Sequence, residues 1–450
     1  MMAYQRKLRD NPPMTTSSRA EAPNIAAHFD LAALPADFYA NPYPYYHALR
    51  EHAPLKPMRD GSWFLTRYDD VVAVYRDPKT FSSDKKSEFG PKYGATSLYE
   101  HHTTSLVFND PPLHTRVRRS ILGALSQRHV AAMEPGLAAL VGQLLDRMAE
   151  RRDVDLIDDF AAAIPVEIIG NLLGVPRSDR APLRGWSLAI LGALEPVLTA
   201  QRAEAGNRAV TEMLAYLKTL VDERRVHPGD PDTDVLTRLI EGEGNGERLT
   251  ETELLHQCIF LLNAGHETTT NLIGNALHAL AQWPDQKSAL IGAVANDDRM
   301  RLAVEEFLRF ESSNQLGNRI TTREVQVGGV TLPPRSRITL CIGAANRDPA
   351  QFAEPDRLDL ARDPNRHVAF GSGIHTCAGM NLAPRGACCA RAVSRALPEL
   401  SADRRPGARR SRPVSGVLAS ARASGLKARP EGRVRERGRG ADVWKPCYRN

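Results

Sequence analysis

Apolar residues recur at helical spacing over much of the first half of the chain. Between residues 137 and 148 they repeat every three or four positions, which is the spacing of the buried stripe on an amphipathic helix. The members of this run are Leu137, Leu140, Val141, Leu144, Leu145 and Met148. Comparable patterns continue to about residue 225, so helices are predicted for most of this region.

The longest predicted helix lies in the second half of the chain. Thr250 and Glu253 are spaced as a capping box, in which each side chain binds the backbone N–H of the other residue. The apolar pattern then runs from Leu254 to Trp283 and stops before Pro284. Such a helix would be about 45 Å long. A shorter helix is predicted over residues 299–310.

β-structure is predicted to be the minor component. Residues 63–66 alternate as a short strand, and residues 325–332 hold Gly-Gly between two short apolar runs, which is a hairpin pattern. Residues 82–108 are polar and irregular, and a loop of that length inside a domain usually has a function. The fold class predicted is therefore mostly α with small β-sheets.

Charge is unevenly distributed along the chain. The net charge is +6, but residues 385–450 contain 17 Lys and Arg against 5 Asp and Glu, which leaves 42 against 48 elsewhere. Residues 403–450 are rich in Arg, Gly and Ser, a composition resembling that of disordered segments. Few aromatic residues accompany these arginines, so nucleic-acid binding is not favoured. We therefore predict a disordered extension over 1–27, one domain over 28–402 and a diverged Arg-rich segment over 403–450.

Cysteine usage and hydropathy indicate the compartment. The chain has six cysteines without a CxxC pair or zinc spacing, so a disulfide framework is not expected and a reducing cytoplasm fits. No run of eighteen apolar residues is present, so no membrane anchor is expected. A soluble, monomeric protein is predicted.

One cysteine lies in a glycine-rich segment, FGSGIHTCAG, at residues 370–379. The glycines would let the backbone approach a large flat ligand and take turns with positive φ. Backbone N–H groups and the positive end of a following helix would favour the thiolate of Cys377. A thiolate is a soft ligand suited to haem iron. The alternatives are an inert cysteine in a turn or a cysteine protease, for which only His375 is nearby as a base.

This segment resembles the haem-thiolate signature of the cytochrome P-450 family. The resemblance implies the cytochrome P-450 fold, haem b as cofactor and Cys377 as the axial iron ligand. It also implies the activity of a monooxygenase, an oxidoreductase that activates O2 with two electrons and hydroxylates its substrate. It covers about residues 28–384.

A second motif, AGHETT at residues 264–269, lies in the middle of the long predicted helix. A zinc protease is excluded, because His266-Glu267 would need a histidine where Thr270 stands. Gly265 would let a flat ligand and dioxygen lie against the backbone, and Thr268 could bond back to a carbonyl. By itself such a pair is more often structural. The family resemblance makes Ala264 a haem contact, Glu267 the proton-relay acid and Thr268 the hydroxyl that steadies reduced oxygen.

A third motif pairs Glu306 with Arg309, three residues apart on a predicted helix. Taken alone it would be an ordinary surface ion pair of small energetic value. The resemblance implies instead a buried pair, joined by Arg357, that holds the fold behind the haem.

Further positions correspond to haem-propionate contacts of the family. His114 and Arg118 would lie one turn apart on the same helix face. Each position alone would fit a solvated charge or a satisfied histidine. The resemblance implies that five residues contact the haem propionates: His114, Arg118, Arg319, His367 and His375.

The resemblance also implies an external electron donor, since this chain has no flavin or iron–sulfur segment. The expected partners are a ferredoxin and its NAD(P)H-dependent reductase. A basic surface around the cysteine loop would attract an acidic partner. The candidates for that surface are Arg116, Arg119, Arg347, Arg362 and Arg385.

The substrate is expected to contact residues 82–108, 188–198, 262–264 and 316–318. Their apolar members include Leu191, Leu194, Val197, Leu262 and Leu316. Such a lining favours a lipophilic small molecule, for example a terpenoid or a polyketide. A peroxide-driven haem enzyme is one alternative, although it would not need the pair Glu267 and Thr268. A non-catalytic or impaired haem-binding protein is the other, because Pro384 and Gly386 disfavour the helix expected after Cys377.

Overall fold

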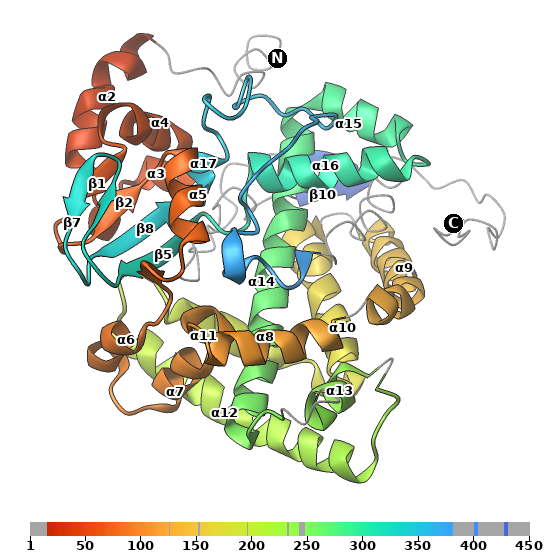
Figure 1. Cartoon of the computed structure of the whole chain (residues 1–450). Coiled ribbons are helices and arrows are strands. Elements are labelled where there is room, and N and C mark those ends of the chain that lie inside the picture. The colour runs from red at the N-terminus through yellow and green to blue at the C-terminus, as the bar shows by residue number, and fades with distance from the viewer. Residues whose placement is uncertain are drawn as a thin grey trace.

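The computed structural model describes residues 16–380 except 126, 152–153, 196, 232–233 and 243–247, together with residues 400–403 and 427–430. A region containing the main sheet lies on one side of the molecule, and a larger helical body lies on the other (Figure 1). The prediction of a mostly α protein with small sheets is confirmed.

The sheet region combines the first part of the chain with strands from much later. Its helices are α2 (Thr16–His28), α3 (Ala36–Ala40), α4 (Tyr43–His52), α5 (Tyr68–Arg76) and α17 (Ile342–Ala345). Its strands, in spatial order, are β1 (Leu55–Pro57), β2 (Trp63–Leu65), β8 (Arg337–Cys341), β5 (Leu316–Thr321) and β3 (Phe81–Ser82). β8 is parallel to β2 and antiparallel to β5, so the chain returns to this sheet after the helical body is complete.

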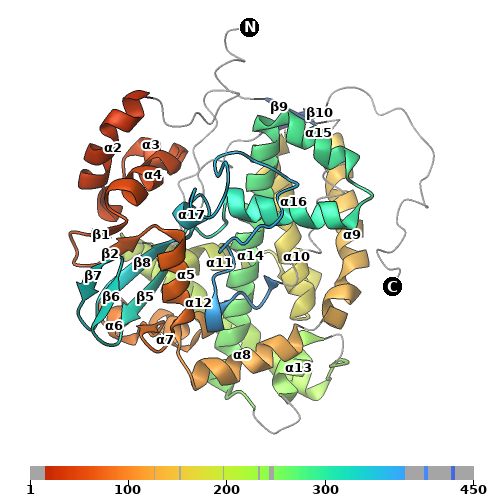
Figure 2. The ribbon, with the colours of Figure 1, turned by 45° about the horizontal axis from the view of Figure 1, so that its top comes forward.

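The helical body is built around α14 (Glu251–Gln282), which runs through its middle in both Figure 1 and Figure 2. The predicted capping box is present: Glu253 N lies 3.2 Å from Thr250 Oγ1, and Thr250 N lies 2.9 Å from Glu253 Oε2. The other helices are α8 (Leu113–Ala124), α9 (Gln127–Ala149), α10 (Ala163–Leu172), α11 (Leu183–Gly192), α12 (Ala200–Val226), α13 (Val235–Glu241), α15 (Pro284–Gly292) and α16 (Asp297–Phe310).

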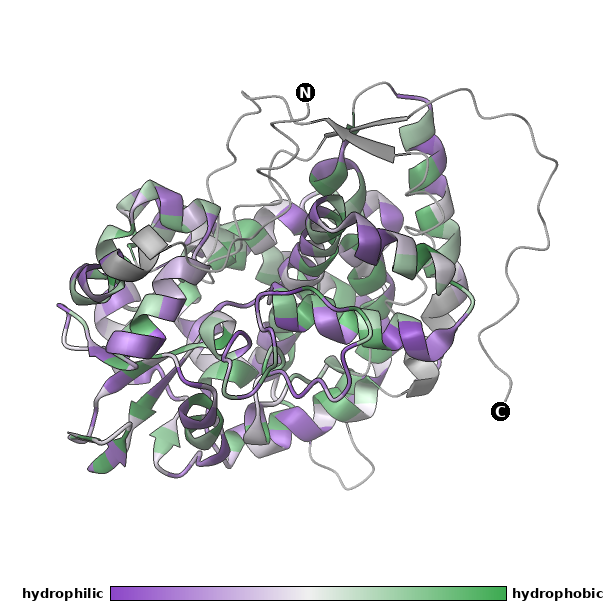
Figure 3. Ribbon diagram, turned by 90° about the horizontal axis from the view of Figure 1, so that it is seen from above, coloured by the Kyte–Doolittle hydropathy of each residue, from purple (hydrophilic) through white to green (hydrophobic). Residues whose placement is uncertain are grey.

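Two apolar clusters meet on α14. Ile259 belongs to the cluster with α10, α11 and α12, whereas Leu277 belongs to the cluster with α9 and α16. Hydrophilic and hydrophobic positions alternate around the helices in Figure 3, as expected for amphipathic helices whose apolar sides form the core. α14 is therefore covered on most of its surface and forms a rigid support.

Residues 82–108 are not the irregular loop that was predicted. They form α6 (Lys86–Tyr93), α7 (Ser97–Thr104) and a 3₁₀ turn, Leu106–Phe108. Thr96 caps α7 by accepting from Tyr99 N at 3.2 Å, and Gly94 ends α6 with φ 62°. Each helix has only eight residues, too few for apolar periodicity to stand out.

The N-terminal boundary also differs from the prediction. Helix α2 extends over residues 16–28, and Ala22 and Ala26 are buried against α4. Ordered structure therefore begins before residue 28, because small side chains allow the two helices to approach closely. Residues 1–15 lie outside the described part of the chain.

The smaller sheets are formed by short strands. β6 (Val325–Val327) and β7 (Val330–Leu332) form the predicted hairpin, with Gly328 and Gly329 at φ 55° and 82°. β10 (Lys427–Pro430) pairs with both β9 (Leu400–Asp403) and β4 (Val154–Asp155). At least these residues of the Arg-rich segment therefore pair with the body, and the rest of 404–450 lies outside the described residues.

In the part of the chain that the structure describes, no helix combines the length and apolar character needed to cross a membrane.

Candidate functional site

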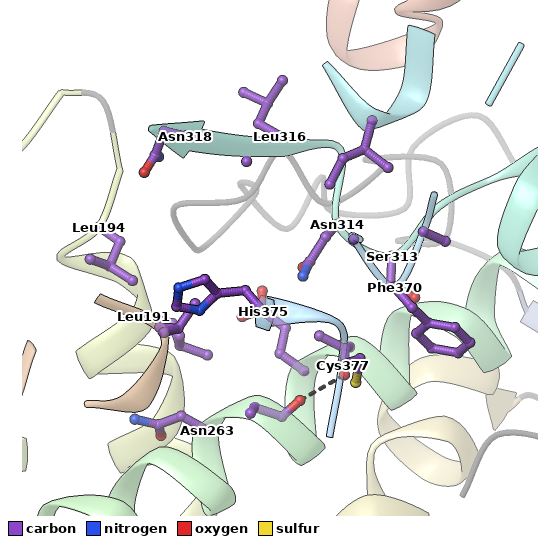
Figure 4. Close-up of a pocket in the computed structure, with 18 of the residues that line it drawn as sticks. Leu191, Leu194, Asn263, Ser313, Asn314, Leu316, Asn318, Phe370, His375 and Cys377 are labelled. Atoms are coloured by element: carbon purple, nitrogen blue, oxygen red, sulfur yellow. Dashed lines mark hydrogen bonds between the residues drawn. The ribbon is translucent and has the colours of Figure 1, made fainter. Parts of the chain in front are cut away.

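A cavity of about 1430 Å³ separates α14 from the cysteine-containing loop. Ala264, Glu267 and Thr268 line it from α14, and residues 316–319 line it from β5. Figure 4 shows His375 and Cys377 on the loop between these two elements, with Leu191 and Leu194 of the α11 region across the space. The three segments are far apart in the sequence, so the site exists only in the folded chain.

The cysteine loop has the tight backbone that its glycines predicted. Gly371 and Gly373 have φ values of 67° and 72°, and the N–H of Cys377 donates to the carbonyl oxygen of Phe370 at 2.9 Å. A short 3₁₀ turn, η6 (Gly373–His375), precedes the cysteine. The Cys377 side chain is exposed into the cavity instead of being packed in the core. The sulfur is therefore accessible to a ligand.

The expected stabilisation of the Cys377 thiolate is only partly present. Desolvation by the protein around the cavity raises the pKa of the thiol even though the sulfur is accessible, and the Gly379 N–H and the Arg118 guanidinium act in the opposite direction. The helix expected after the loop lies outside the described residues. A bound metal ion would supply the missing positive charge, because a coordinating thiol is deprotonated.

Four of the predicted propionate contacts lie together at one side of the cavity. Arg118, Arg319 and His375 line it, and the rings of His114 and His375 are 4.1 Å apart between centroids. Arg118 Nη2 donates to the carbonyl oxygen of Thr376 at 2.6 Å, which ties α8 to the cysteine loop. Helix α8 therefore brings His114 and Arg118 to the same place as the loop.

These four residues form a positively charged corner that suits an anion. Burial lowers the pKa of both His114 and His375, and the guanidinium groups of Arg118 and Arg319 lower both further. Within the described structure, three ring nitrogens have no hydrogen-bond partner: Nδ1 and Nε2 of His114 and Nε2 of His375. A carboxylate placed here would accept hydrogen bonds and relieve the repulsion. The residues present therefore fit a haem with its propionates.

The structure does not bring His367, the fifth predicted propionate contact, to this corner. Its Nε2 lies 2.7 Å from Glu305 Oε2, and the side chain is not among those that line the cavity. The neighbouring Glu305 carboxylate already satisfies this imidazole, so His367 is placed as a structural histidine behind the loop.

On α14, Thr268 takes the conformation that was predicted. Its hydroxyl donates to the carbonyl oxygen of Ala264 at 2.7 Å, one turn earlier. Glu267 is 8% exposed, and burial together with Glu195 raises the pKa of its carboxyl group to about 8. Glu267 is therefore largely protonated at neutral pH and can donate a proton into the cavity that it lines.

Gly265 has a second role that its sequence position did not indicate. A Cβ at this position would overlap the side chain of Ile169 in α10. The glycine is therefore needed for the close packing of α10 on α14, in addition to its place in the cavity lining.

Glu306 and Arg309 form the predicted buried pair. Arg309 Nε and Nη2 donate to the two carboxylate oxygens of Glu306 at 2.7 and 2.8 Å, and both side chains are 0% exposed. Arg309 Nη1 also donates to the carbonyl oxygens of Asn346 and Pro355. The pair thus joins α16 to the irregular segment that leads to the cysteine loop.

Contrary to the prediction, the side chain of Arg357 does not join the Glu306–Arg309 pair. Its guanidinium is 56% exposed and binds Glu354, while its carbonyl oxygen accepts from Arg309 at 3.2 Å. Arg362 supplies the third guanidinium, with Nε 3.2 Å from Glu306 Oε2. Sequence spacing could not distinguish the two arginines, because the irregular segment between them determines which one turns inward.

Among the described candidates for the predicted basic surface, three arginines are engaged in ion pairs. Arg347 is 0% exposed and binds Asp356 and the carbonyl oxygen of Phe310, and Arg362 is bound to Glu306. Arg116 forms a bidentate pair with Glu253. Arg119 is exposed on α8, whereas Arg385 lies outside the described residues.

All four segments expected to contact the substrate contribute to the cavity lining, although Val197 and Leu262 do not. The sequence did not single out Tyr75, His101, His102 or Lys85, which also line it. The consecutive histidines in a polar segment were the available signal for two of them.

The family model of cytochrome P-450 matches residues 189–385. The chain is 37% identical over 387 residues to the cytochrome P-450 monooxygenase PikC of Streptomyces venezuelae, covering 84% of this chain and 89% of that protein. It is 37% identical over 351 residues to the vitamin D(3) 25-hydroxylase of Pseudonocardia autotrophica, covering 77% and 83%.

A solved structure supports the same assignment. The crystal structure of CalO2 superposes with a TM-score of 0.79 at 28% identity, covering 89% of this chain and 98% of that one. The cysteine loop facing a long central helix is thus accompanied by similarity over most of the sequence. The chain belongs to the cytochrome P-450 family and is a monooxygenase by class.

Proposed function

We propose that this protein binds haem b through Cys377 and hydroxylates a lipophilic small molecule. The observation that carries the proposal is the position of Cys377, which is open to a large cavity that Glu267 and Thr268 line from α14. When bound, the haem would supply the oxygen-activating and electron-accepting chemistry. The remaining tasks belong to side chains of this chain.

The first task is to hold and orient the cofactor. Cys377 would be the axial ligand, since its sulfur is accessible. His114, Arg118, Arg319 and His375 would bind the propionates, because they form a positively charged, partly buried corner beside the loop. Charge-assisted hydrogen bonds of this kind are stronger than neutral ones.

The second task is to deliver protons. Glu267 keeps a proton on its carboxyl group at neutral pH because burial raises its pKa to about 8. The Thr268 hydroxyl donates its hydrogen to the carbonyl oxygen of Ala264. Its oxygen can therefore accept a hydrogen bond from a ligand in the cavity. The two residues together hold one proton and one acceptor at the same turn of α14.

The third task is to select the substrate. Leu191, Leu194 and Leu316 give the cavity apolar walls, which favours a lipophilic molecule. His101, His102 and Asn263 also line it, are at most 4% exposed and have polar atoms without a partner in the described structure. Leaving such atoms unbonded is costly, so a substrate with a hydroxyl or carbonyl group is favoured.

The charge of that substrate group follows from the two histidines. Burial lowers the pKa of His102 to about 3 and that of His101 well below its usual value. Both imidazoles are therefore neutral at pH 7 and suit an uncharged oxygen better than a carboxylate. The similarity to the vitamin D(3) 25-hydroxylase of Pseudonocardia autotrophica supports a lipophilic substrate.

The electron donor is proposed to be a ferredoxin with its NAD(P)H-dependent reductase. Monooxygenation consumes two electrons per turnover. The haem site is the only redox site proposed among the described residues, so the electrons are proposed to come from an external donor. The supporting test compares product formed with ferredoxin, reductase and NAD(P)H against product formed with hydrogen peroxide alone. Turnover only with peroxide would contradict the role given to Glu267 and Thr268.

The central experiment is the difference spectrum of the reduced protein with carbon monoxide. A strongly red-shifted Soret band is expected for the wild-type chain, because a thiolate donates electron density to the iron. Cys377→His should move the band to the position typical of histidine-ligated haem. Cys258→Ala, which changes a buried cysteine of α14, is the control and should leave the band unchanged. A histidine-type band for the wild type would overturn the proposal.

A further inference from the structure

Tyr75, near the end of α5, contacts β5 and the cysteine loop, two of the elements that meet at the positively charged corner. Its side chain is 6% exposed and lines the cavity. The guanidinium carbon of Arg319 lies 4.9 Å from the centre of its ring. This geometry is that of a cation–π interaction, in which the ring face attracts the cation.

The same residue also contacts the cysteine loop. A Cβ on Gly373 would overlap the backbone carbonyl oxygen of Tyr75, and the position of a Cβ on Gly371 lies 3.9 Å from Tyr75 Cε1. The next residue, Arg76, has its Nε 3.4 Å from Ser372 Oγ. α5 lies between β5 and the blue segment of η6 in Figure 1 and in Figure 2.

On its other side, Tyr75 fixes the distance to β5. A Cβ on Gly317 would overlap the Tyr75 hydroxyl, so the ring fits only because this strand position is a glycine. Gly317 is two residues before Arg319, and alternate residues of a strand point to the same face. The tyrosine therefore occupies the face of β5 from which Arg319 extends.

Arg319 needs such support because it is buried. It is 6% exposed, and its Nη1 donates to the carbonyl oxygen of its neighbour Asn318 at 2.7 Å. The nearby carboxylate of Asp110 is occupied by Ser82 and by the N–H of Ser83. The face of the Tyr75 ring is thus a main contact that restricts the direction of the guanidinium.

We propose that Tyr75 is a positioning residue whose ring aims the Arg319 guanidinium at an anionic ligand beside the Cys377 loop. The ligand is a haem carboxylate, so this inference rests on the proposed function. Tyr75 itself makes no bond to the iron and transfers no proton. Without the ring, Arg319 would have more rotamers available and would bind the carboxylate less tightly.

The test measures the rate at which haem leaves the holoenzyme for excess apomyoglobin. Tyr75→Leu should accelerate release roughly three- to tenfold, the loss expected for one partly desolvated cation–π contact. Tyr75→Phe keeps the ring face and should stay within about twofold of wild type. In an Arg319→Ala background, Tyr75→Leu should have no further effect, because the group it aims is gone.

A second measurement separates positioning from simple packing. A guanidinium near the haem favours the reduced state, so Tyr75→Leu and Arg319→Ala should both lower the haem midpoint potential, and the double variant should lower it no further. Phe81→Leu, which changes a buried aromatic of the same apolar cluster, is the control and should not shift the potential. Tyr75→Met, whose unbranched side chain is longer than that of leucine and adapts its shape to the space left by the ring, replaces Tyr75→Leu if that variant does not fold.

Additive effects in the Arg319→Ala background would overturn the inference, and so would loss of haem from Tyr75→Phe equal to that from Tyr75→Leu. A wild-type chain without thiolate-bound haem would instead overturn the proposed function on which the inference rests. The two failures are therefore distinguishable in the wild-type spectrum alone.

Discussion

The imidazole rings of His114 and His375 lie 4.1 Å apart between their centroids, although one lies in the first turn of α8 and the other belongs to the cysteine loop. His114 is buried, His375 is partly buried, and both rings lie beside Arg118 and Arg319. Their unsatisfied nitrogens explain why the corner is incomplete without an anionic ligand.

We expect His114→Phe to weaken haem retention while keeping the ring contact. A hydrogen bond to a charged group contributes about 1.5–3 kcal/mol, so haem release should be roughly tenfold faster or more. The measurement is transfer of haem to apomyoglobin. His52→Phe, at the end of α4 and outside the cavity lining, is the matched control. An unchanged release rate for His114→Phe would remove this residue from the propionate site.

The buried pair of Glu306 and Arg309 should be the most sensitive ionic contact. Removing one partner of a buried pair costs about 3–5 kcal/mol, so Glu306→Ala should lower the free energy of unfolding by that order. Arg362→Ala should cost about 1–3 kcal/mol, because it removes a hydrogen bond to the buried carboxylate.

Arg357→Ala is the control for this series, since its side chain is exposed and only its carbonyl oxygen contacts Arg309. Its effect should stay within about 0.5 kcal/mol. Urea unfolding of the four proteins measures the series. A larger effect for Arg357→Ala than for Arg362→Ala would show that Arg357 is the third member of the pair after all.

Glu267 should make stability depend on pH in a defined direction. Its pKa is raised to about 8 in the folded protein, so the unfolded chain binds fewer protons than the folded one between about pH 4.5 and about pH 8. The stabilisation from the neutral carboxyl is complete below this range and is lost as the pH rises through it. The loss should be of the order of a few kcal/mol.

Glu267→Gln keeps the shape and cannot ionise. The free energy of unfolding of the wild type, relative to this variant, should therefore fall steadily from about pH 5 to about pH 8.5. Urea unfolding at several pH values measures the difference. A difference independent of pH would mean that Glu267 is ionised in the folded protein and is not the proton donor.

Gly265→Ala tests the packing of α10 on α14. An extra methyl group in a tight contact costs about 1–3 kcal/mol, which exceeds the gain of about 0.5–1 kcal/mol from replacing a helical glycine. The variant should therefore be less stable than wild type. The overlapping group is the Ile169 side chain, with Cδ1 the nearest atom and Cγ1 at 3.1 Å.

Ile169→Val removes that Cδ1 atom and provides the matched background. In it, Gly265→Ala should become neutral or stabilising, because the helix propensity of alanine then acts without the overlap. Equal destabilisation in both backgrounds would show that Gly265 is required by something other than Ile169.

The linear sequence determined those features that depend on local physical chemistry. The capping box at Thr250, the end of α14 before Pro284 and the hairpin at Gly328 follow from contacts within a few residues. The Cys377 segment was equally recognisable, because its glycines and cysteine form one continuous motif. These parts could be predicted because the interacting groups are neighbours in the chain.

Only the tertiary structure decided which distant side chains meet. It selected Arg362 over Arg357 as the partner of Glu306, and it turned His367 toward Glu305 and away from the cavity. It also placed the ring of Tyr75 beside Arg319, a contact between α5 and β5 that no local pattern encodes. The physical reason is that a charge becomes structural or functional through its burial and its neighbours, and both are set by packing between segments far apart in the sequence.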